Sequence, residues 1–195
     1  HFLRAASLGG SLAAALEAGD RVRSGELVAR VFRASRMGFL TLVDHRGTVV
    51  GRGWAPSAGG DDLSHNPLVA RVLARREPAQ GTLLIDADEL AREGPELAER
   101  ARFRLRPTQA ARPTDETIRT EGMVLAAAAP VLDGEGRLLG VLYGGNLLNR
   151  QYDLVDAIRA GRRPAIEGAE ARKALEIILA VYRSAQTGQP VTLPL

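Results

Sequence analysis

Several side chains of this sequence carry groups that recognise small molecules. An arginine can bind a carboxylate through two parallel N–H bonds, and an aromatic ring can form one wall of an apolar pocket. Strand alternation predicts that Arg52 and Trp54 lie on one face with Val50. We therefore hypothesise a ligand site, and its candidate ligand-binding residues are Arg52, Trp54, His65, Arg106, Thr108 and Tyr143.

Some of these residues also have a structural interpretation. Trp54 fits simple packing in the core, and Arg106 fits an exposed surface position. Asp61 and Asp62 suggest a cation site, but an acidic loop in front of a helix is more often simply solvated. At these three places the sequence leaves both interpretations open.

Nothing in the sequence predicts catalysis. The chain has 3 histidines and no cysteine, so thiolate chemistry is excluded and only His65 is free to act as a base. The glycine-rich segment 134–140 precedes an apolar strand, whereas a nucleotide-binding loop follows a strand and opens a helix. We expect no enzyme activity from this chain alone, no cofactor and no metal site.

The composition is that of one soluble globular domain. The chain has 195 residues, of which 45% are hydrophobic and 25% charged. The chain has 26 basic and 23 acidic residues, and Arg and Glu alternate in stretches such as 91–104, which argues against a nucleic-acid partner. No apolar run approaches the roughly 20 residues that span a bilayer, so membrane contact is expected only through segments outside this chain.

One turn pattern occurs twice and predicts the centre of the fold. Residues 43–51 (VDHRGTVVG) and 132–140 (LDGEGRLLG) share an apolar residue, Asp, two loop residues, Gly, and then two apolar residues before a second Gly. Asp can bind the backbone two residues on, and Gly adopts a positive φ. Each copy predicts a β-hairpin, and the two hairpins predict one antiparallel sheet with a long insertion.

Helical patterns flank and interrupt these hairpins, so the predicted fold class is α+β. A polar, arginine-rich excursion is expected over 103–121. Helices are predicted over 3–32 with glycine interruptions, 66–75 with Ser64 or Asn66 as the cap, 88–102 with a break at Gly94 and Pro95, 151–159 and 169–185, and a strand over 81–85.

Two stretches of small residues predict space above the sheet. Residues 126–129 are all alanine, and Gly144 and Gly145 lie in the second hairpin. Because protein interiors are close-packed, something must fill the volume that these side chains leave. A tightly packed helix and a bound ligand remain equal alternatives.

From about residue 8 to 158 the sequence resembles the Cache sensor domains of bacterial histidine kinases and chemoreceptors. The stretches that carry the resemblance are 60–69 (GDDLSHNPLV), 121–131 (EGMVLAAAAPV) and 140–150 (GVLYGGNLLNR). The resemblance implies a PAS-like antiparallel sheet, a long N-terminal helix and a small-molecule site on the sheet. It divides the chain into an N-terminal signalling helix (1–36), a sensor domain (37–160), and a linker, C-terminal helix and tail (161–195).

The resemblance also implies a function. We expect the periplasmic portion of an inner-membrane signal-transduction protein that binds a small, anionic metabolite of the organic acid or amino acid class. A homodimer through the N-terminal helix is a further expectation.

Residues 168–195 resemble a different family, the C-terminal tail of Gfo/Idh/MocA-type oxidoreductases, through the segment 174–188 (ALEIILAVYRSAQTG). The alternative hypothesis is therefore a fragment of such an NAD(P)-dependent enzyme without its nucleotide-binding domain.

Overall fold

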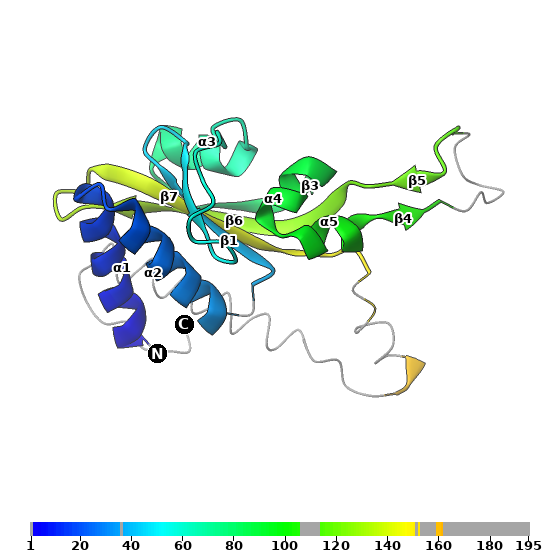
Figure 1. Ribbon diagram of the computed structural model, residues 1–195, viewed down its shortest axis with the longest axis horizontal. Coiled ribbons are helices and arrows are strands. Elements are labelled where there is room, and N and C mark those ends of the chain that lie inside the picture. The colour runs from blue at the N-terminus through cyan, green and yellow to red at the C-terminus, as the bar shows by residue number, and fades with distance from the viewer. Residues whose placement is uncertain (1, 36, 106–113, 151, 153–158, 162–195) are drawn as a thin grey trace. The chain divides into compact units, whose positions relative to one another are not determined.

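The centre of the protein is an antiparallel sheet of five strands in the order β2-β1-β7-β6-β3 (Figure 1). Its strands are β1 (Phe39–Asp44), β2 (Val49–Arg52), β3 (Ala79–Ile85), β6 (Gly122–Leu132) and β7 (Leu138–Leu147). In this computed structural model, the described residues are 2–35, 37–105, 114–150, 152 and 159–161. The predicted α+β class is confirmed.

The two predicted hairpin turns form by the same local chemistry. Asp44 and Asp133 each accept two backbone N–H bonds of 2.8–2.9 Å from residues two and four positions further on. Gly47 and Gly136 adopt φ values of 91° and 80°, a region that favours glycine. The paired sequence motif therefore closes both hairpins, and β1 pairs with β7 to join them in one sheet.

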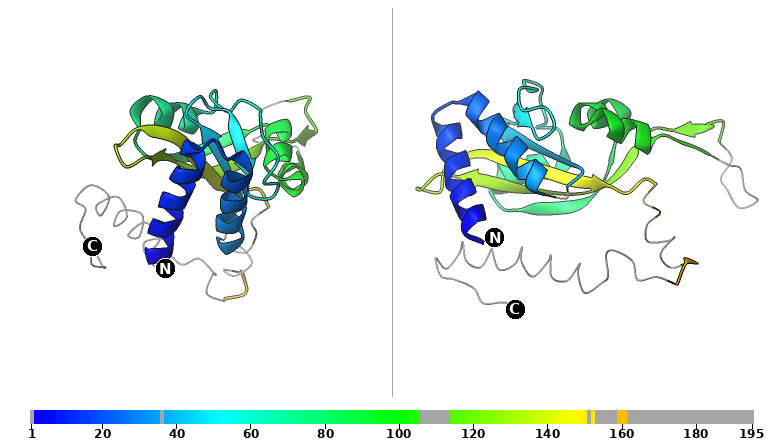
Figure 2. Two further views of the ribbon diagram at one scale, coloured as in Figure 1. Left: turned by 60° about the vertical axis from the view of Figure 1, so that its left-hand side comes forward. Right: turned by 60° about the horizontal axis from the view of Figure 1, so that its bottom comes forward.

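Helices cover both faces of this sheet (Figure 2). We call the face under α3, α4 and α5 the inner face and the face under α1 and α2 the outer face. The helices are α1 (Phe2–Glu17), α2 (Arg21–Ala34), α3 (Pro67–Arg75), α4 (Ala87–Glu93) and α5 (Pro95–Ala101). The predicted interruption near Gly19 and the predicted break at Gly94 both occur.

Each face has its own hydrophobic cluster. On the inner face Phe39 and Tyr143 pack edge to face, with ring centroids 5.2 Å apart. On the outer face Leu40 and Leu42 of β1 pack with residues of α1 and α2. Along β6, side chains alternate between buried and exposed, and Leu125 is 55% exposed. No described residue therefore covers the outer face near Leu125.

A helix fills the space that the small residues of β6 leave. Ala126 and Ala128 are buried in the inner cluster together with Leu68, Val69 and Val72 of α3. Small side chains on the sheet let this helix approach closely. Of the two alternatives, the helix is the one that the structure supports at these positions.

The insertion contains a short second sheet that the sequence did not predict. Strands β4 (Phe103–Arg104) and β5 (Ile118–Arg119) pair antiparallel and extend away from the central sheet (Figure 1). The surface excursion expected over 103–121 therefore contains a two-stranded ribbon formed by β4 and β5. The candidate residues Arg106 and Thr108 lie outside the described residues.

The chain divides into two compact units, residues 1–150 and 151–195. The helices predicted over 151–159 and 169–185 fall largely or wholly outside the described residues, and the division into 1–36, 37–160 and 161–195 stays a prediction. Among the described residues, no helix has both the length and the apolar character needed to cross a membrane.

Candidate ligand-binding site

A β-bulge directs Arg52 to the inner face of the sheet. Thr41 pairs with Arg52 and Leu42 with Gly51, but Val43 pairs with Val49, so the register shifts and Val50 has no partner in β1. The extra residue reverses the alternation of side chains beyond it. Val50 packs in the outer cluster, whereas Arg52 is only 3% exposed beside Thr41. The prediction that Val50 and Arg52 share a face is wrong for this reason.

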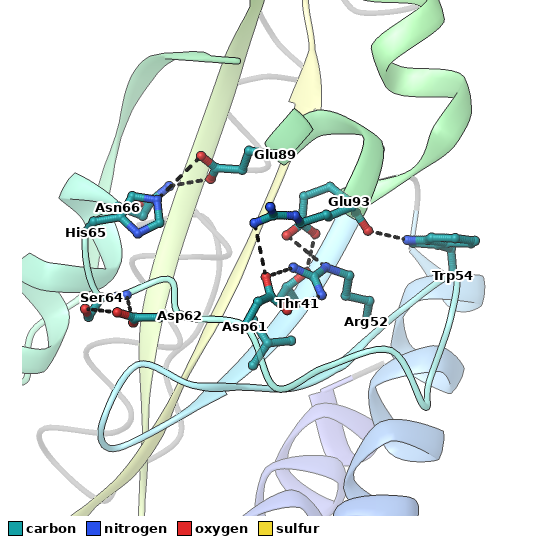
Figure 3. A network of polar contacts seen from close by, with 12 residues as sticks. Thr41, Arg52, Trp54, Asp61, Asp62, Ser64, His65, Asn66, Glu89 and Glu93 are labelled. Carbon is teal, nitrogen blue, oxygen red and sulfur yellow. Dashed lines mark hydrogen bonds and ion pairs between the residues drawn. The ribbon is translucent and has the colours of Figure 1, made fainter. Parts of the chain in front are cut away.

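Arg52 is held by two carboxylates (Figure 3). Its Nη1 and Nη2 donate to the two oxygens of Asp61 at 2.9 and 2.7 Å, and its Nε donates to Glu93 Oε1 at 3.2 Å. Thr41 Oγ1 donates to the other carboxylate oxygen of Glu93, and the residue Glu93 is only 1% exposed. The four residues come from β1, β2, the loop after β2 and the end of α4, and we call them the Arg52 cluster.

The charges of the Arg52 cluster do not cancel when both acids are ionised, because one guanidinium faces two carboxylates. The hydrogen bonds from Arg52 lower the pKa of Asp61, whereas burial raises the pKa of Glu93. Asp61 is 27% exposed and Glu93 is fully enclosed. The Arg52 cluster therefore has one carboxylate at the solvent boundary and one fixed in the interior.

A second polar group surrounds Asn66. Asn66 Oδ1 accepts from the N–H groups of Leu68 and Val69 and so caps α3, with Pro67 at its first position as predicted. Its Nδ2 donates to the Tyr143 hydroxyl at 3.2 Å and to Glu89 Oε1 at 3.3 Å. Tyr143 is completely buried, and burial raises the pKa of its hydroxyl.

Helix α4 connects the two polar groups. Glu89 and Glu93 lie four residues apart, so they share one face of the helix. Asp86 caps the helix by accepting from the N–H of Glu89 at 2.8 Å. Figure 3 shows Glu89 directed toward Asn66 and His65, and Glu93 directed toward Arg52 and Thr41. One short helix therefore places a carboxylate in each group.

Trp54 and His65 lie at the margins of this region. Trp54 is 46% exposed, and its Nε1 donates to the carbonyl of Arg92 at 2.9 Å. The alternative of Trp54 as a core residue is therefore not what the structure shows. The side chain of His65 is 64% exposed, with its Nε2 3.9 Å from Glu89 Oε2.

The structure thus brings Arg52, Trp54, His65 and Tyr143 into one region, and Arg106 and Thr108 lie outside the described residues. Sequence reasoning did not name Asn66, Glu89 and Glu93 as candidate residues, although they contact Tyr143 and Arg52 and the spacing of the two glutamates was a usable signal.

The two acidic residues that suggested a cation site have other partners. Asp61 binds Arg52, and Asp62 accepts from the backbone N–H of Ser64 at 2.7 Å. In the described part of the chain, no group of three or more histidine, cysteine or acidic side chains is arranged to hold a metal ion.

Comparison with known proteins assigns the family. Residues 2–161 match the dCache_3 family, described as the double sensory domain of two-component sensor kinases. The match covers well over half of the chain, so this chain belongs to the dCache_3 family and is a sensor domain of the Cache type. The resemblance noted in the sequence is confirmed.

A solved structure with a similar chain is the periplasmic domain of Vibrio cholerae LuxQ. The identity is 18% and the TM-score 0.44, and the match covers 82% of this chain and 64% of that one. This chain therefore spans less than two thirds of that domain. No curated protein sequence matches the chain.

Proposed function

We propose that this chain is the extracytoplasmic, ligand-binding part of a membrane-bound signal-transduction protein of the histidine kinase or chemoreceptor type. Its family is described as a sensory domain of two-component sensor kinases, which supports this assignment. In the proposal the chain binds a small molecule and performs no catalysis, and segments outside it contact the membrane.

We propose further that the ligand binds at the Arg52 cluster. The observation that carries this proposal is the bidentate pair between Arg52 and Asp61, in which both oxygens of a partly exposed carboxylate bind a buried guanidinium. The carboxylate of a small anionic metabolite offers the same geometry and charge. It would replace the side chain of Asp61, while Glu93 would keep the Nε of Arg52 in place.

An amino acid fits this site as well as an organic acid does. Its carboxylate would bind Arg52, and its ammonium group would find the carboxylate of Glu89, which lies on the same face of α4 as Glu93. In this proposal Trp54 and His65, which are both exposed, contact the remainder of such a ligand.

A signal would leave the site through the loop that carries Asp61. The same loop contacts α2 at Pro56, whose carbonyl oxygen lies 2.2 Å from the position that a Cβ on Gly25 would take. Arg21 of α2 also donates to the carbonyl of Val49 at 2.8 Å. Displacing Asp61 would move a loop packed on α2 and so shift the preferred position of that helix.

The test is a calorimetric titration with a panel of dicarboxylates and amino acids. We expect Asp61→Asn to bind a carboxylate ligand more tightly than the wild type, because the internal competitor loses its charge. Arg52→Lys should bind it at least tenfold more weakly, because lysine cannot form the bidentate pair. Asp62→Asn is the matched control and should leave the affinity unchanged.

Two results would contradict the proposal. One is the absence of binding by every compound of the panel to both the wild type and Asp61→Asn. The other is saturable binding of NAD(P)H, which the alternative of an oxidoreductase fragment predicts. That alternative rests on residues 168–195, which lie outside the described residues and beyond the family match.

A further inference from the structure

The carboxylate of Asp61 lies between two arginines that differ in burial. Its Oδ2 is 2.7 Å from Nη2 of Arg52 and 3.9 Å from Nη1 of Arg92. The side chain of Arg52 is 3% exposed, whereas that of Arg92 is 57% exposed. Hydrogen bonds between such groups span about 2.7–3.2 Å. A small movement of either side chain would therefore exchange one arginine partner of Asp61 for the other.

Arg52 is in turn shared between two carboxylates. Its Nη1 and Nη2 bind Asp61, and its Nε donates to Glu93 at 3.2 Å. The side chain of Glu93 is fully enclosed, so solvent does not stabilise a charge on it. Ionising a buried carboxylate that shares its cation with another acid is costly. A proton on Glu93 removes this cost and leaves Arg52 and Asp61 as a balanced pair.

Among the described residues around Glu93, no second buried cation is present. Thr41 contributes a hydroxyl, which can donate to an ionised carboxylate or accept from a protonated one. The charged residues of α5 are all exposed. Burial raises the pKa of the Tyr143 hydroxyl, so this group stays uncharged. The charged and titratable groups that face Glu93 are Arg52 of β2, Asp61 of the loop after β2, Glu89 and Arg92 of α4, and Tyr143 of β7.

We propose that the Arg52 cluster is a proton sensor, in which Glu93 carries one proton and its release to solvent transfers Asp61 from Arg52 to Arg92. With the proton bound, Arg52 holds Asp61 in the bidentate pair. After its release, Arg52 neutralises the ionised Glu93, and Asp61 turns to the exposed Arg92. The switch needs no ligand and goes beyond the proposed function.

Trp54 is placed to report this exchange. It is the only tryptophan of the chain, and its Nε1 donates to the carbonyl of Arg92 at 2.9 Å. Because Trp54 lies in the loop that carries Asp61, this bond joins the loop to α4 (Figure 3). We expect the tryptophan fluorescence of the full chain to change in one transition with a midpoint above pH 4.5, the ordinary pKa of a glutamate.

A pH titration of this fluorescence is the first test. Glu93→Gln should lose the transition. Glu96→Gln is the matched control: it makes the same change at an exposed glutamate of α5, and it should keep the transition. Asp61→Asn should lower the midpoint by about one pH unit, because Arg52 then serves Glu93 alone. Arg92→Gln should raise the midpoint, because the ionised state loses its second cation.

Infrared difference spectroscopy is the second test, because it distinguishes a carboxyl proton from a histidine proton. Over the pH range of the fluorescence transition, the wild type should lose the band of a protonated carboxyl group, and Glu93→Gln should show no such loss. His65→Gln removes the histidine closest to Glu89 and should keep both changes.

The proposal is overturned by a wild type without a transition, by a transition that persists in Glu93→Gln or disappears in His65→Gln, or by an unchanged midpoint in Asp61→Asn. Circular dichroism establishes that each variant is folded. If Glu93→Gln does not fold, the opposite shifts of Asp61→Asn and Arg92→Gln decide the matter. None of these measurements uses a ligand, so their outcome and that of the calorimetric titration are independent.

Discussion

The two faces of the central sheet are closed by different kinds of contact. Both faces bury an apolar cluster, but the inner face also buries charged side chains, with Arg52 and Glu93 exposed by only 3% and 1%. On the outer face, apolar residues and glycines meet, and α2 approaches β2 so closely that a Cβ on Gly51 would lie 3.0 Å from the Cα of Gly25.

This difference matters for a sensor. An ion pair can exchange one of its partners for a ligand group of the same charge without leaving a buried charge unpaired. The close backbone contact between α2, β2 and the loop at Pro56 has no polar partner to exchange. A movement of the loop therefore moves α2 with it. The inner face is therefore suited to binding, and the outer face is suited to passing on a movement of the loop that touches α2.

The largest expected effect comes from removing the buried cation. Arg52→Met leaves Glu93 without its ionic partner in the interior, so we expect the free energy of unfolding to fall by about 3–5 kcal/mol. Urea denaturation followed by circular dichroism measures this change. Arg92→Met is the control: its guanidinium is 57% exposed and 3.9 Å from Asp61, and little change is expected.

A double variant separates the cost of an unpaired charge from the loss of packing. Arg52→Met/Glu93→Leu replaces the buried pair by apolar side chains, and such replacements are often close to neutral. It should recover most of the stability that Arg52→Met loses. If the double variant were as unstable as the single one, the unpaired charge of Glu93 would not be the cause of the loss, and the contrast between the Arg52 cluster and the apolar contacts of the outer face would lose its energetic basis.

The next effect tests the outer face. Gly25→Ala would place a Cβ 2.2 Å from the carbonyl oxygen of Pro56, so α2 and the loop must separate. Overpacking of this kind costs about 1–3 kcal/mol. The gain in helix propensity of at most about 1 kcal/mol is too small to compensate. We expect a lower midpoint of thermal unfolding and an altered affinity of the Arg52 cluster for its ligand.

Gly10→Ala is the matched control for that variant. Gly10 is exposed on α1, and nothing lies within 4 Å of the position of a new Cβ. Here the propensity gain acts alone, and we expect stabilisation by about 0.5–1 kcal/mol. Equal behaviour of the two variants would contradict the close contact between α2 and the loop.

Local signals predicted most of the fold. The Asp and Gly residues of the two turns determined both hairpins, and Asn66 with Pro67 marked the start of α3. These features depend on hydrogen bonds and backbone angles within a few residues, which a sequence displays directly. The short β4–β5 pair was missed because each strand has only two residues and no alternation can develop.

The site was predicted less well because its contacts are distant in sequence. Arg52 meets Glu93 across 41 positions, and a glutamate in a helix rich in arginine and glutamate looks like a surface residue. The sequence also carried no sign of the bulge at Val50, because a bulge is defined by the pairing of β2 with β1. Alternation therefore assigned Val50 and Arg52 to one face.

A smaller effect is expected at the junction of α3 with the sheet. Asn66→Ala removes the cap of α3 and the bonds to Tyr143 and Glu89, and the loss of such a cap costs about 1 kcal/mol. Tyr143→Phe keeps the cap and removes only one hydroxyl, so its cost should be lower. Chemical denaturation of both variants checks the order, and a greater loss in Tyr143→Phe would show that the hydroxyl, not the cap, dominates.

The smallest effect is a pH dependence with opposite contributions from the two acids of the Arg52 cluster. Burial raises the pKa of Glu93 above 4.5, so the folded state holds a proton that the unfolded state has lost, and stability falls as the pH rises from 4.5 through the folded pKa. Arg52 lowers the pKa of Asp61 below 3.8, so stability falls as the pH drops from 3.8 through its folded pKa.

Single variants resolve the two contributions. Glu93→Gln should flatten the decline of stability above pH 4.5, and Asp61→Asn should flatten the decline below pH 3.8. Urea denaturation at a series of pH values measures both slopes. If Glu93→Gln left the upper slope unchanged, Glu93 would be ionised throughout that range. Glu93 would then be a fixed carboxylate, and the partly exposed Asp61 alone would be available for exchange with a ligand.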